Sequence, residues 1–308
     1  MVSGTCVIGC IIGRNTMNSI TVKAYAKINI GLDVLGKRPD GYHDVSMIMQ
    51  SVDLHDTVTI RKTRFKSITV DTNLYFLPTD RRNLAYKAVE VFDGHHPIRC
   101  GLNIFINKRI PVAAGLAGGS TDAAAVLTGL NKMFQAGLSA EELMKLGVRI
   151  GADVPYCLLM GTALSEGIGE ILKPIKPLPD CHILLVKPNI SVSTKYVYEN
   201  LRLNDSIRHP DIPAMIEAIE ESDLYRLASL MENILETITI KEYPIIGGIK
   251  EKMKDLNALA SVMSGSGPTV FGIFDSRQKA ENAYRFFKSM DSGMQAILTK
   301  PYFPGNMN

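Results

Sequence analysis

The amino-acid sequence predicts an α+β fold built from two domains, and three observations support this prediction. The chain has 308 residues, which exceeds the usual size of one domain and suggests two domains of about 150 residues each. Strand-like and helix-like segments follow one another without the regular alternation of a doubly wound parallel sheet. Hydrophobic residues make up 46% and charged residues 21% of the chain, which is enough apolar material for two cores.

Charge and cysteine content argue against several classes of protein. The chain carries 34 lysines and arginines against 31 aspartates and glutamates, a net charge of +3. Proteins that bind nucleic acid through bulk charge usually have a strong basic excess, whereas a local site can still bind a small anion. The five cysteines form no Cys-x-x-Cys pair, and their number is odd. Both facts argue against a secreted disulfide framework and a structural zinc site, and they favour a reducing cytoplasm.

The first sixteen residues form a segment with its own composition. Their apolar run, residues 6–12, is far shorter than the roughly 20 residues that a membrane span needs. The segment also lacks the basic start and the small-residue cleavage site of a signal peptide. A disordered extension and a start codon assigned too early are the two interpretations, and we favour Met17 as the true start. No other segment approaches membrane length, so the sequence predicts a soluble protein.

The first half begins with the clearest alternation in the chain. In residues 20–34 apolar side chains fall on one face, and polar side chains, including Lys27 and Asn29, fall on the other. This pattern predicts a strand with one buried and one polar face, and a Pro-Asp-Gly turn follows it. We expect further strands at residues 45–52, 57–60, 67–70 and 101–107, with 67–70 paired to 57–60, and helices at residues 83–92, at 121–134 and from the capping box of Ser139 and Glu142 onward.

The chain contains no internal repeat, and its second half has strands and helices of its own. A proline-rich stretch, residues 173–179, predicts the connection between the domains. We therefore expect an extension at residues 1–16, a first domain at residues 17–176 and a second domain at residues 177–308. Alternation and helical spacing predict strands at residues 182–186, 260–263, 269–274 and 295–299, and helices at residues 212–220, 224–235, 245–256 and 277–290.

A glycine-rich loop at residues 111–122 is the most informative segment. Its three glycines permit close approach of a ligand, and it leads into a helix whose first amides and dipole attract an anion. Ser120 can either cap this helix or turn its hydroxyl to phosphate or Mg²⁺, and Asp122 would complement the dipole. The loop is not a Walker A loop, since no lysine follows its last glycine, and it matches the dinucleotide fingerprint poorly. A plain strand-to-helix turn is the alternative, but small residues clustered before a helix favour phosphate binding.

Two charged side chains are candidates for chemistry. Lys27 lies two residues from Asn29, about 7 Å along the predicted strand. Lys27 can hold a substrate phosphate or lower the pKa of a reacting hydroxyl, and the alternative is a solvated lysine. Asp153 precedes Val-Pro at a predicted helix-to-strand corner. It can serve as a general base or as an N-cap, and the local sequence favours neither role.

Two loops supply further candidates. Tyr42 and His43 follow the predicted turn, where they can stack on and hydrogen-bond to a base or sugar. The alternative is a partly buried tyrosine beside a surface histidine. Residues 264–269, with the sequence SGSGPT, join two predicted strands. Such a segment can bring backbone amides to a second anion, or it can be a plain β-turn.

Three of these segments, residues 23–29, 111–122 and 264–269, occur in an order that resembles the GHMP kinase superfamily, small-molecule kinases without a Walker loop. The resemblance extends from Met17 to about residue 300. It implies a ribosomal-protein-S5-domain-2-like N-terminal half, which binds ATP, and a ferredoxin-like C-terminal half. The motifs AKIN, RPDGYH, AAGLAGGS and GADVP are similar to those of the branch whose alcohol substrate carries a cytidylyl group.

The resemblance implies an ATP-dependent enzyme that phosphorylates the 2-hydroxyl of cytidylyl-methylerythritol, on the non-mevalonate route to isoprenoid precursors. ATP and Mg²⁺ would be its cofactors, with Ser120 as a candidate metal ligand. Lys27 and Asp153 would form the catalytic pair, with Asp153 as the base. His43 would hydrogen-bond the cytosine between the rings of Tyr42 and Tyr198, with Tyr196 as the alternative to Tyr198. Asn29, Tyr42, His43, Thr194 and Tyr198 would contact the substrate, and Pro111, Val112, Ala113, Ala114, Gly115, Leu116, Ala117, Gly118, Gly119, Ser120 and Thr121 would contact ATP.

Other functions are compatible with parts of this pattern. Another kinase of the superfamily, acting on homoserine or mevalonate, is the nearest alternative. A non-catalytic nucleotide or sugar sensor and an RNA-binding relative of the N-terminal half are more distant ones. The presence of both Lys27 and Asp153 speaks against a sensor, and the net charge of +3 speaks against RNA. The sequence leaves open whether the protein is a monomer or a homodimer.

Overall fold

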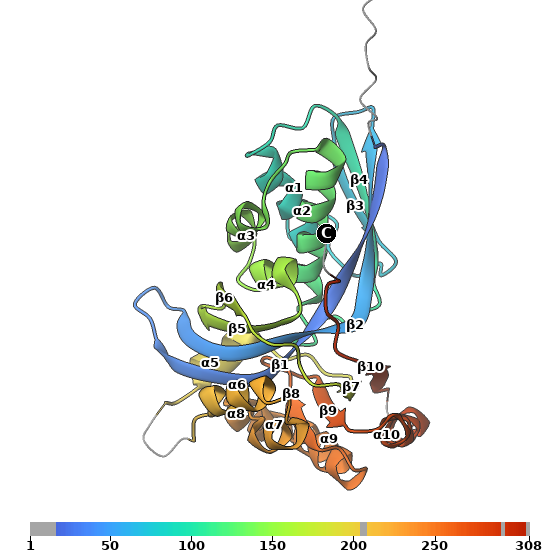
Figure 1. Ribbon diagram of the computed structural model, residues 1–308. Coiled ribbons are helices and arrows are strands. Elements are labelled where there is room, and N and C mark those ends of the chain that lie inside the picture. The colour runs from blue at the N-terminus through green and yellow to red at the C-terminus, as the bar shows by residue number, and fades with distance from the viewer. Residues whose placement is uncertain (1–16, 204–207, 291–292, 306–308) are drawn as a thin grey trace, which may run out of the picture.

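A computed structural model describes residues 17–203, 208–290 and 293–305, and Figure 1 shows how its elements are arranged. The predictions for residues 1–16 lie outside the described residues. A long antiparallel hairpin of β1 (Ser19–Lys37) and β2 (His43–Thr63) runs through the molecule. The hairpin is part of the first sheet; four helices lie on one side of it, and the second sheet lies on the opposite side (Figure 1). Among the described residues, no helix is long and apolar enough to cross a bilayer.

The first sheet is built on β2. Its order is β3-β4-β2-β5-β6, and β1 also pairs with β2. The prediction of two strands at residues 45–52 and 57–60 was wrong, because β2 continues between them, where His55 and Asp56 stay paired with β1. The prediction that residues 67–70 pair with residues 57–60 was also wrong. There both edges of β2 are occupied by β1 and β4, so β3 pairs with β4 in parallel. The remaining strands are β3 (Ile68–Thr72), β4 (Gly101–Asn107), β5 (Thr162–Gly167) and β6 (Ile171–Pro174).

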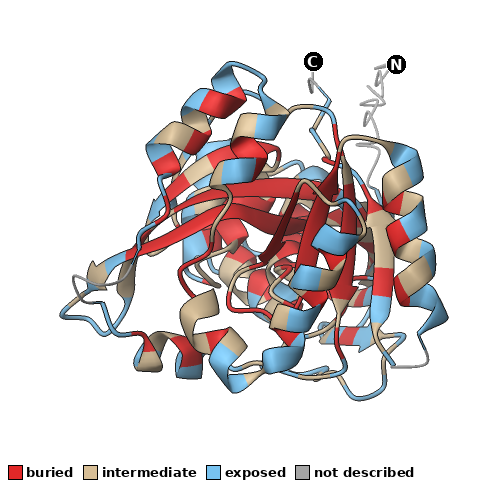
Figure 2. Ribbon diagram, turned by 90° about the horizontal axis from the view of Figure 1, so that it is seen from below, coloured by how far each residue is buried: buried red, intermediate tan, exposed pale blue. Residues whose placement is uncertain are grey.

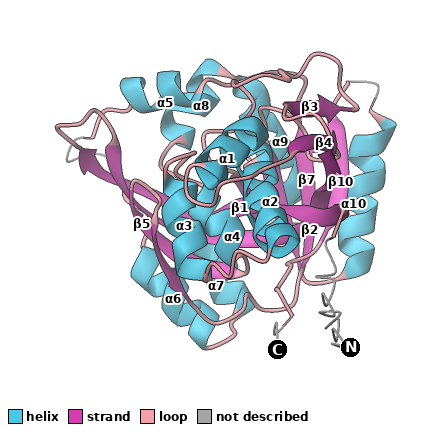
Figure 3. Ribbon diagram, turned by 90° about the horizontal axis from the view of Figure 1, so that it is seen from above, coloured by secondary structure: helices cyan, strands magenta, loops and turns pink. Residues whose placement is uncertain are grey.

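Four helices cover one face of this sheet, as Figures 1 and 3 show. Asn83 caps the first of them by accepting a hydrogen bond from the amide of Ala85 at 2.9 Å, and the predicted capping box of Ser139 and Glu142 is confirmed. The glycine-loop helix starts earlier than predicted and has Ala117 at its N-cap position, so Ser120 is not the cap. The helices are α1 (Leu84–Asp93), α2 (Gly118–Phe134), α3 (Ala140–Val148) and α4 (Val154–Leu159).

The second sheet is antiparallel, with the order β10-β7-β9-β8. Its strands are β7 (His182–Lys187), β8 (Ala260–Met263), β9 (Val270–Phe274) and β10 (Gln295–Thr299), each within one residue of its prediction at both ends. The helices α6 (Ile212–Glu220), α9 (Pro244–Asp255) and α10 (Arg277–Ser289) also follow the predictions. Helix α7 (Leu224–Leu230) ends five residues early, because the chain turns so that Asn233 can bridge to Leu32 of β1. The predictions missed α5 (Thr194–Asn200) and α8 (Glu236–Glu242), which have seven residues each.

Strand β1 is buried on both faces over much of its length, which the sequence pattern did not predict. Exposure alternates only up to Tyr25, and the polar side chains of Lys27 and Asn29 are then buried. Register shifts against β2 accompany this change, and the apolar residues of β1 divide between two cores. Ala24 and Leu32 pack in one core, whereas Ile28 packs in the other, with the second sheet and α6. Figure 2 shows these buried strands in the middle of the molecule. The strand therefore places its polar residues at the junction of the two halves.

Candidate active site

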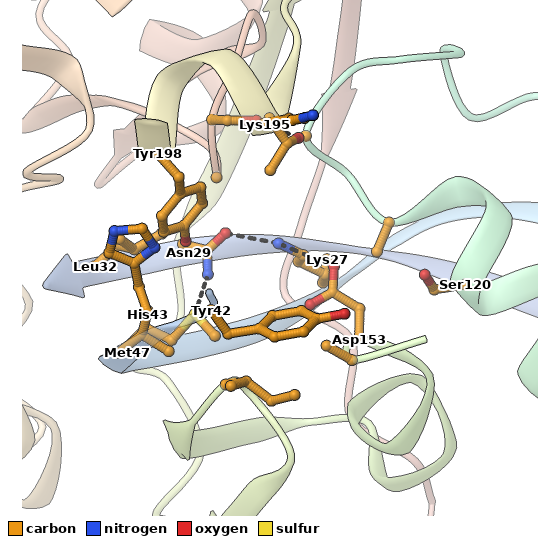
Figure 4. Close-up of a pocket in the computed structure, with 18 of the residues that line it drawn as sticks. Lys27, Asn29, Leu32, Tyr42, His43, Met47, Ser120, Asp153, Lys195 and Tyr198 are labelled. Carbon is orange, nitrogen blue, oxygen red and sulfur yellow. Dashed lines mark hydrogen bonds and ion pairs between the residues drawn. The ribbon is translucent and has the colours of Figure 1, made fainter. Parts of the chain in front are cut away.

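A cavity of about 970 Å³ opens at this junction, and both halves of the chain line it. The first half contributes the polar residues of β1, the start of β2, the glycine loop and the segment before α4. The second half contributes the first turns of α5 and part of the 264–269 segment. Figure 4 shows the side chains that converge here. The predicted site residues in the lining are Lys27, Asn29, Tyr42, His43, Ala113, Gly115, Ala117, Gly118, Gly119, Ser120, Asp153, Thr194 and Tyr198.

Lys27 is held in the cavity by the strand that carries it. Its amide donates to the carbonyl of Leu116 in the glycine loop at 3.2 Å, which joins β1 to that loop. Its ammonium group donates to Oδ1 of Asn29 at 2.7 Å and lies 3.9 Å from Oδ2 of Asp153. Asn29 Nδ2 in turn contacts the sulfur of Met47 at 3.2 Å (Figure 4). The alternation of the strand therefore places Lys27 and Asn29 on one face, with the ammonium group directed at the carboxylate.

Asp153 occupies the N-cap position of α4, but its side chain makes no capping hydrogen bond. The segment joins α3 to α4, so the predicted helix-to-strand corner is wrong. The Asp153 side chain is 34% exposed, whereas that of Lys27 is 6% exposed. A carboxylate that is partly open to the cavity and faces a buried ammonium group can accept a proton from a hydroxyl bound between them.

The glycine loop is fitted against the second half of the chain. Gly115 has φ +73°, and a Cβ atom there would lie 2.2 Å from the carbonyl oxygen of Ser264. The hydroxyl of Ser264 donates to the carbonyl of Gly115 at 2.9 Å. Helix α2 has no side-chain cap, so its first amides can bind an anion in the cavity. Of the predicted ATP contacts, Pro111 and Val112 line a second hollow of about 120 Å³, whereas Ala114, Leu116 and Thr121 are buried and line neither space.

A buried ionic cluster lies behind the glycine loop. Lys108 donates to Asp56 at 2.5 Å, to Asp122 at 2.7 Å and to the carbonyl of Gly118 at 3.3 Å. Asp56 also accepts the amide of Ile110 at 2.8 Å. Asp122 was predicted in the first turn of the helix, but it lies beyond that turn and is buried. Burial raises the pKa of Asp122 well above the usual range of an aspartate. All three donors of the ammonium group are used, so Lys108 supports the loop and leaves no donor for a phosphate.

The opposite end of the cavity is aromatic. The rings of His43 and Tyr198 lie 5.2 Å apart at 42°, and Tyr42 is at the edge with 60% of its surface exposed. Burial, and then the charge of Lys37, lower the pKa of His43, and burial raises the pKa of Tyr198. Tyr196 does not belong to the cavity lining, and its hydroxyl contacts Glu242 at 3.2 Å. A neutral imidazole beside a tyrosine ring suits a planar base with donors and acceptors on its edge.

Two polar contacts order the part of the site that comes from the second half. Thr194 Oγ1 and Ser266 Oγ lie 2.8 Å apart, which links α5 to the 264–269 segment. Asn233 Nδ2 donates to the carbonyls of Met263 and Gly265 at 2.7 and 2.8 Å, and Asn233 is 1% exposed. Sequence reasoning missed Asn233, because it lies in a run with helical spacing and nothing local marks it.

Comparisons with known proteins agree with this geometry. The family described as GHMP kinases N terminal domain matches residues 83–161, and the family GHMP kinases C terminal matches residues 215–292. The 4-diphosphocytidyl-2-C-methyl-D-erythritol kinase of Lachnoclostridium phytofermentans is 56% identical over 92% of this chain and 98% of its own length. That of Clostridium perfringens strain ATCC 13124 is 48% identical over 93% of this chain and 99% of its own length.

Solved structures of kinases that act on different substrates match this fold almost equally well. A crystal structure of 4-(cytidine 5'-diphospho)-2C-methyl-D-erythritol kinase matches with a TM-score of 0.78 at 30% identity, over 92% of this chain and 100% of the other. A homoserine kinase from Cytophaga hutchinsonii matches with a TM-score of 0.79 at 20% identity, over 93% and 96% of the two chains. The second match shows the shared fold alone, so it is the sequence identity that distinguishes the branch. The chain belongs to the 4-diphosphocytidyl-2-C-methyl-D-erythritol kinase family of the GHMP kinases.

Proposed function

We propose that this protein transfers the γ-phosphoryl group of ATP to the 2-hydroxyl of 4-(cytidine 5'-diphospho)-2-C-methyl-D-erythritol, in the cytoplasm, on the non-mevalonate route to isoprenoid precursors. One observation carries the proposal. The Lys27–Asp153 pair, at 3.9 Å, shares a single cavity with the aromatic pair of His43 and Tyr198. A substrate with an alcohol at one end and a cytosine at the other matches both pairs.

The residues divide the chemistry between them. Asp153 accepts the proton of the 2-hydroxyl as the new bond to phosphorus forms and the bond to the β-phosphate oxygen breaks, which leaves ADP. Lys27 lies beside the attacking oxygen and stabilises its developing negative charge. Asn29 holds the Lys27 ammonium group in place by accepting its hydrogen bond at 2.7 Å. Most of the rate enhancement then comes from positioning and from charge stabilisation, as in other phosphoryl transfers.

ATP is assigned to the glycine loop. Its phosphates lie against the amides at the start of α2, and its base enters the second hollow, beside Pro111 and Val112. This hollow also contains Leu77, which offers apolar contact to a purine. The division of labour follows the expected domains, with residues 17–176 binding ATP and residues 177–308 completing the acceptor site.

Mg²⁺ fits the donors that the cavity offers. The hydroxyl of Ser120 and the carboxylate of Asp153 both line it, and both are hard oxygen ligands. Among the described residues there is no group of three or more acidic, histidine or cysteine side chains that could enclose a metal ion. The ion would therefore be held mainly by the phosphates, with Ser120 as a protein ligand. When bound, it neutralises charge on the phosphates.

Coupled measurement of ADP release over a panel of alcohols tests the proposal. We expect turnover with the cytidylyl substrate, and little with homoserine, mevalonate or methylerythritol lacking the cytidylyl group. The Asp153→Asn variant is the control, because any ADP that it still releases does not come from catalysis at this site. Equal turnover of the alcohol without its cytidylyl group would contradict the assignment. ATP binding without ADP release from any alcohol would favour a sensor instead.

A further inference from the structure

Two lysines besides Lys27 line the cavity, and the chemistry described above uses neither of them. Lys37 lies at the end of β1, in the first half of the chain, and Lys195 lies in the first turn of α5, in the second half. Lys27 is already engaged with Asn29 and Asp153. The cavity therefore presents two further positive charges, one from each half, to whatever it binds.

Both lysines are available to a ligand. The Lys195 ammonium group lies 3.8 Å from Glu199, and its side chain is 82% exposed. By contrast, Lys145 and Glu141, another pair with i,i+4 spacing, lie 2.9 Å apart on the outside of α3. Within the described ranges Lys37 forms no ion pair, and its charge helps to lower the pKa of His43. The long, exposed Lys195–Glu199 ion pair contributes little stability, so Lys195 can exchange it for a contact with a bound anion.

Lys37 and Lys195 are placed where they can contact the middle of an elongated ligand in the cavity. Lys195 lies three residues before Tyr198 on the same helix, so the two side chains project from neighbouring positions. It directly follows Thr194, whose hydroxyl contacts Ser266 beside the glycine loop. In Figure 4 the Lys195 side chain points away from Tyr198, toward the side of the cavity formed by the glycine loop. Lys195 thus lies between the aromatic end and the reacting end, and Lys37 flanks the aromatic end beside His43.

We propose that Lys37 and Lys195 bind the diphosphate that joins the cytidine to the alcohol. The inference rests on the proposed function, which requires a diphosphate diester between the two ends of the cavity. Such a group carries two negative charges at neutral pH, and the two lysines match them. Glu199 also lines the cavity and opposes an anion, so Lys195 must exchange its contact with Glu199 for one with the diphosphate. The lysines then select for a diphosphate-linked alcohol, independently of the cytosine contacts.

Binding of two probes separates this role from recognition of the base. CDP-glycerol carries the diphosphate diester, and cytidine carries the base alone. We expect calorimetry to show that the wild-type protein binds CDP-glycerol at least about tenfold more tightly than cytidine, and that this ratio approaches one in Lys37→Gln/Lys195→Gln. Affinity for cytidine should change less than twofold. Raising the salt concentration should reduce the ratio in the wild-type protein but not in the double variant.

Two further variants serve as controls. Lys195→Arg keeps the charge and should retain most of the ratio. Lys145→Gln removes a lysine of matched spacing outside the cavity and should leave the ratio unchanged. In turnover assays the double variant should raise KM for the cytidylyl substrate about tenfold, with KM for ATP changed less than twofold.

The outcomes distinguish this inference from the proposed function. A wild-type ratio near one, or the same ratio in the double variant, would overturn the diphosphate role even if the enzyme turns over normally. A tenfold ratio that the double variant loses would support the role, even if the reacting alcohol proves to be a different one. An increase in KM for ATP equal to that for the cytidylyl substrate would place the lysines at the nucleotide and overturn the assignment.

Discussion

Lys27 and Asp153 carry opposite charges and differ widely in exposure, and this difference supports the roles proposed for them. The buried lysine stays fixed by Asn29, whereas the partly exposed carboxylate can meet an incoming hydroxyl. Local sequence could not choose between a base and an N-cap for Asp153. The absence of a capping hydrogen bond and the direction of the side chain toward Lys27 favour the base.

Asp153→Asn should lower kcat by about 10²-fold or more, since the amide cannot accept the proton, a loss in the range of general-base catalysis. The shape of the residue is kept, so KM for ATP should change little. Steady-state kinetics with the cytidylyl substrate measures both values. A variant with wild-type kcat would show that Asp153 is not the base.

His43→Ala should weaken binding of the cytidylyl substrate far more than binding of ATP, because His43 lies at the aromatic end of the cavity and away from the glycine loop. Burial and Lys37 lower the pKa of His43, so the imidazole is neutral at pH 7. We therefore expect KM for the cytidylyl substrate to stay constant down to about pH 6.5 and to rise at lower pH as the ring becomes protonated. Equal effects on both substrates, or a KM that does not depend on pH, would count against contact with the cytosine.

Single site residues could be predicted where neighbouring residues in the sequence mark them. They could not be predicted where their partners are distant in the sequence. Lys27 and Asn29 could be predicted because strand alternation alone places them on one face. Tyr198 and Tyr196 could not be separated by sequence, and only the structure shows which of them faces the cavity. Asn233 carries no local signal, because its partners are carbonyls about thirty residues away.

At the level of elements, α2 is the part on which the proposed binding of ATP depends. Lys108 donates hydrogen bonds to the Gly118 carbonyl and to Asp122 of this helix, and it joins the helix to β2 through Asp56. The glycine loop therefore rests on a rigid ionic support. The prediction that Asp122 complements the helix dipole from the first turn was wrong, because α2 starts at Gly118 and the carboxylate pairs with Lys108 inside the molecule.

Asp122→Asn should change how stability depends on pH. Burial raises the pKa of Asp122 in the folded state, so the folded protein holds a proton that the unfolded chain has lost above about pH 4. This contribution is complete below about pH 4 and is lost as the pH rises through the raised pKa. Urea denaturation at several pH values should show a fall in the free energy of unfolding that the variant lacks. Glu141→Gln, in an exposed pair, is the control and should leave the profile unchanged. Parallel profiles for Asp122→Asn and the wild-type protein would mean that Asp122 does not titrate in this range.

Helices and strands could be predicted where the hydrophobic pattern of the sequence extends over enough residues to be recognised. The strands of the second sheet were placed to within a residue, because each is a short apolar run between turns. Helices α5 and α8 span two turns each, too few for a period of 3.6 to show. The pairing of β3 depended on which edges of β2 were already occupied, and sequence pattern carries no information on that.

At the scale of the whole molecule, the two halves are joined by backbone as well as by side chains. The amide of Leu32 donates to the carbonyl of Glu232, and the amide of Ile234 donates to the carbonyl of Leu32, both at 3.0 Å. Asn233 lies between these two bonds and holds the 264–269 segment, where Ser264 meets Gly115. The acceptor site and the phosphate loop are therefore aligned through one short connection.

Asn233→Ala should destabilise the protein and also raise KM for both substrates. The variant leaves the carbonyls of Met263 and Gly265 and the amide of Leu235 without their partner, at a cost of about 1–3 kcal/mol for each buried group. Asn131→Ala is the matched control, since Asn131 makes a similar pair of bonds to Leu138 far from the cavity. It should lower the thermal midpoint without changing either KM. Unchanged kinetics in Asn233→Ala would show that this connection does not align the site.

Strand β1 has a consequence for dividing this protein into fragments. A cut after residue 176 falls where the chain leaves the first sheet, yet β1 belongs to both cores. The fragment ending at residue 176 would leave Ala26, Ile28 and Ile30 open to solvent, while the other fragment would lose the strand that covers its sheet. Neither piece would fold as an independent unit. Phosphoryl transfer would return only on complementation, so this enzyme could be built as a split reporter whose signal depends on the reunion of its fragments.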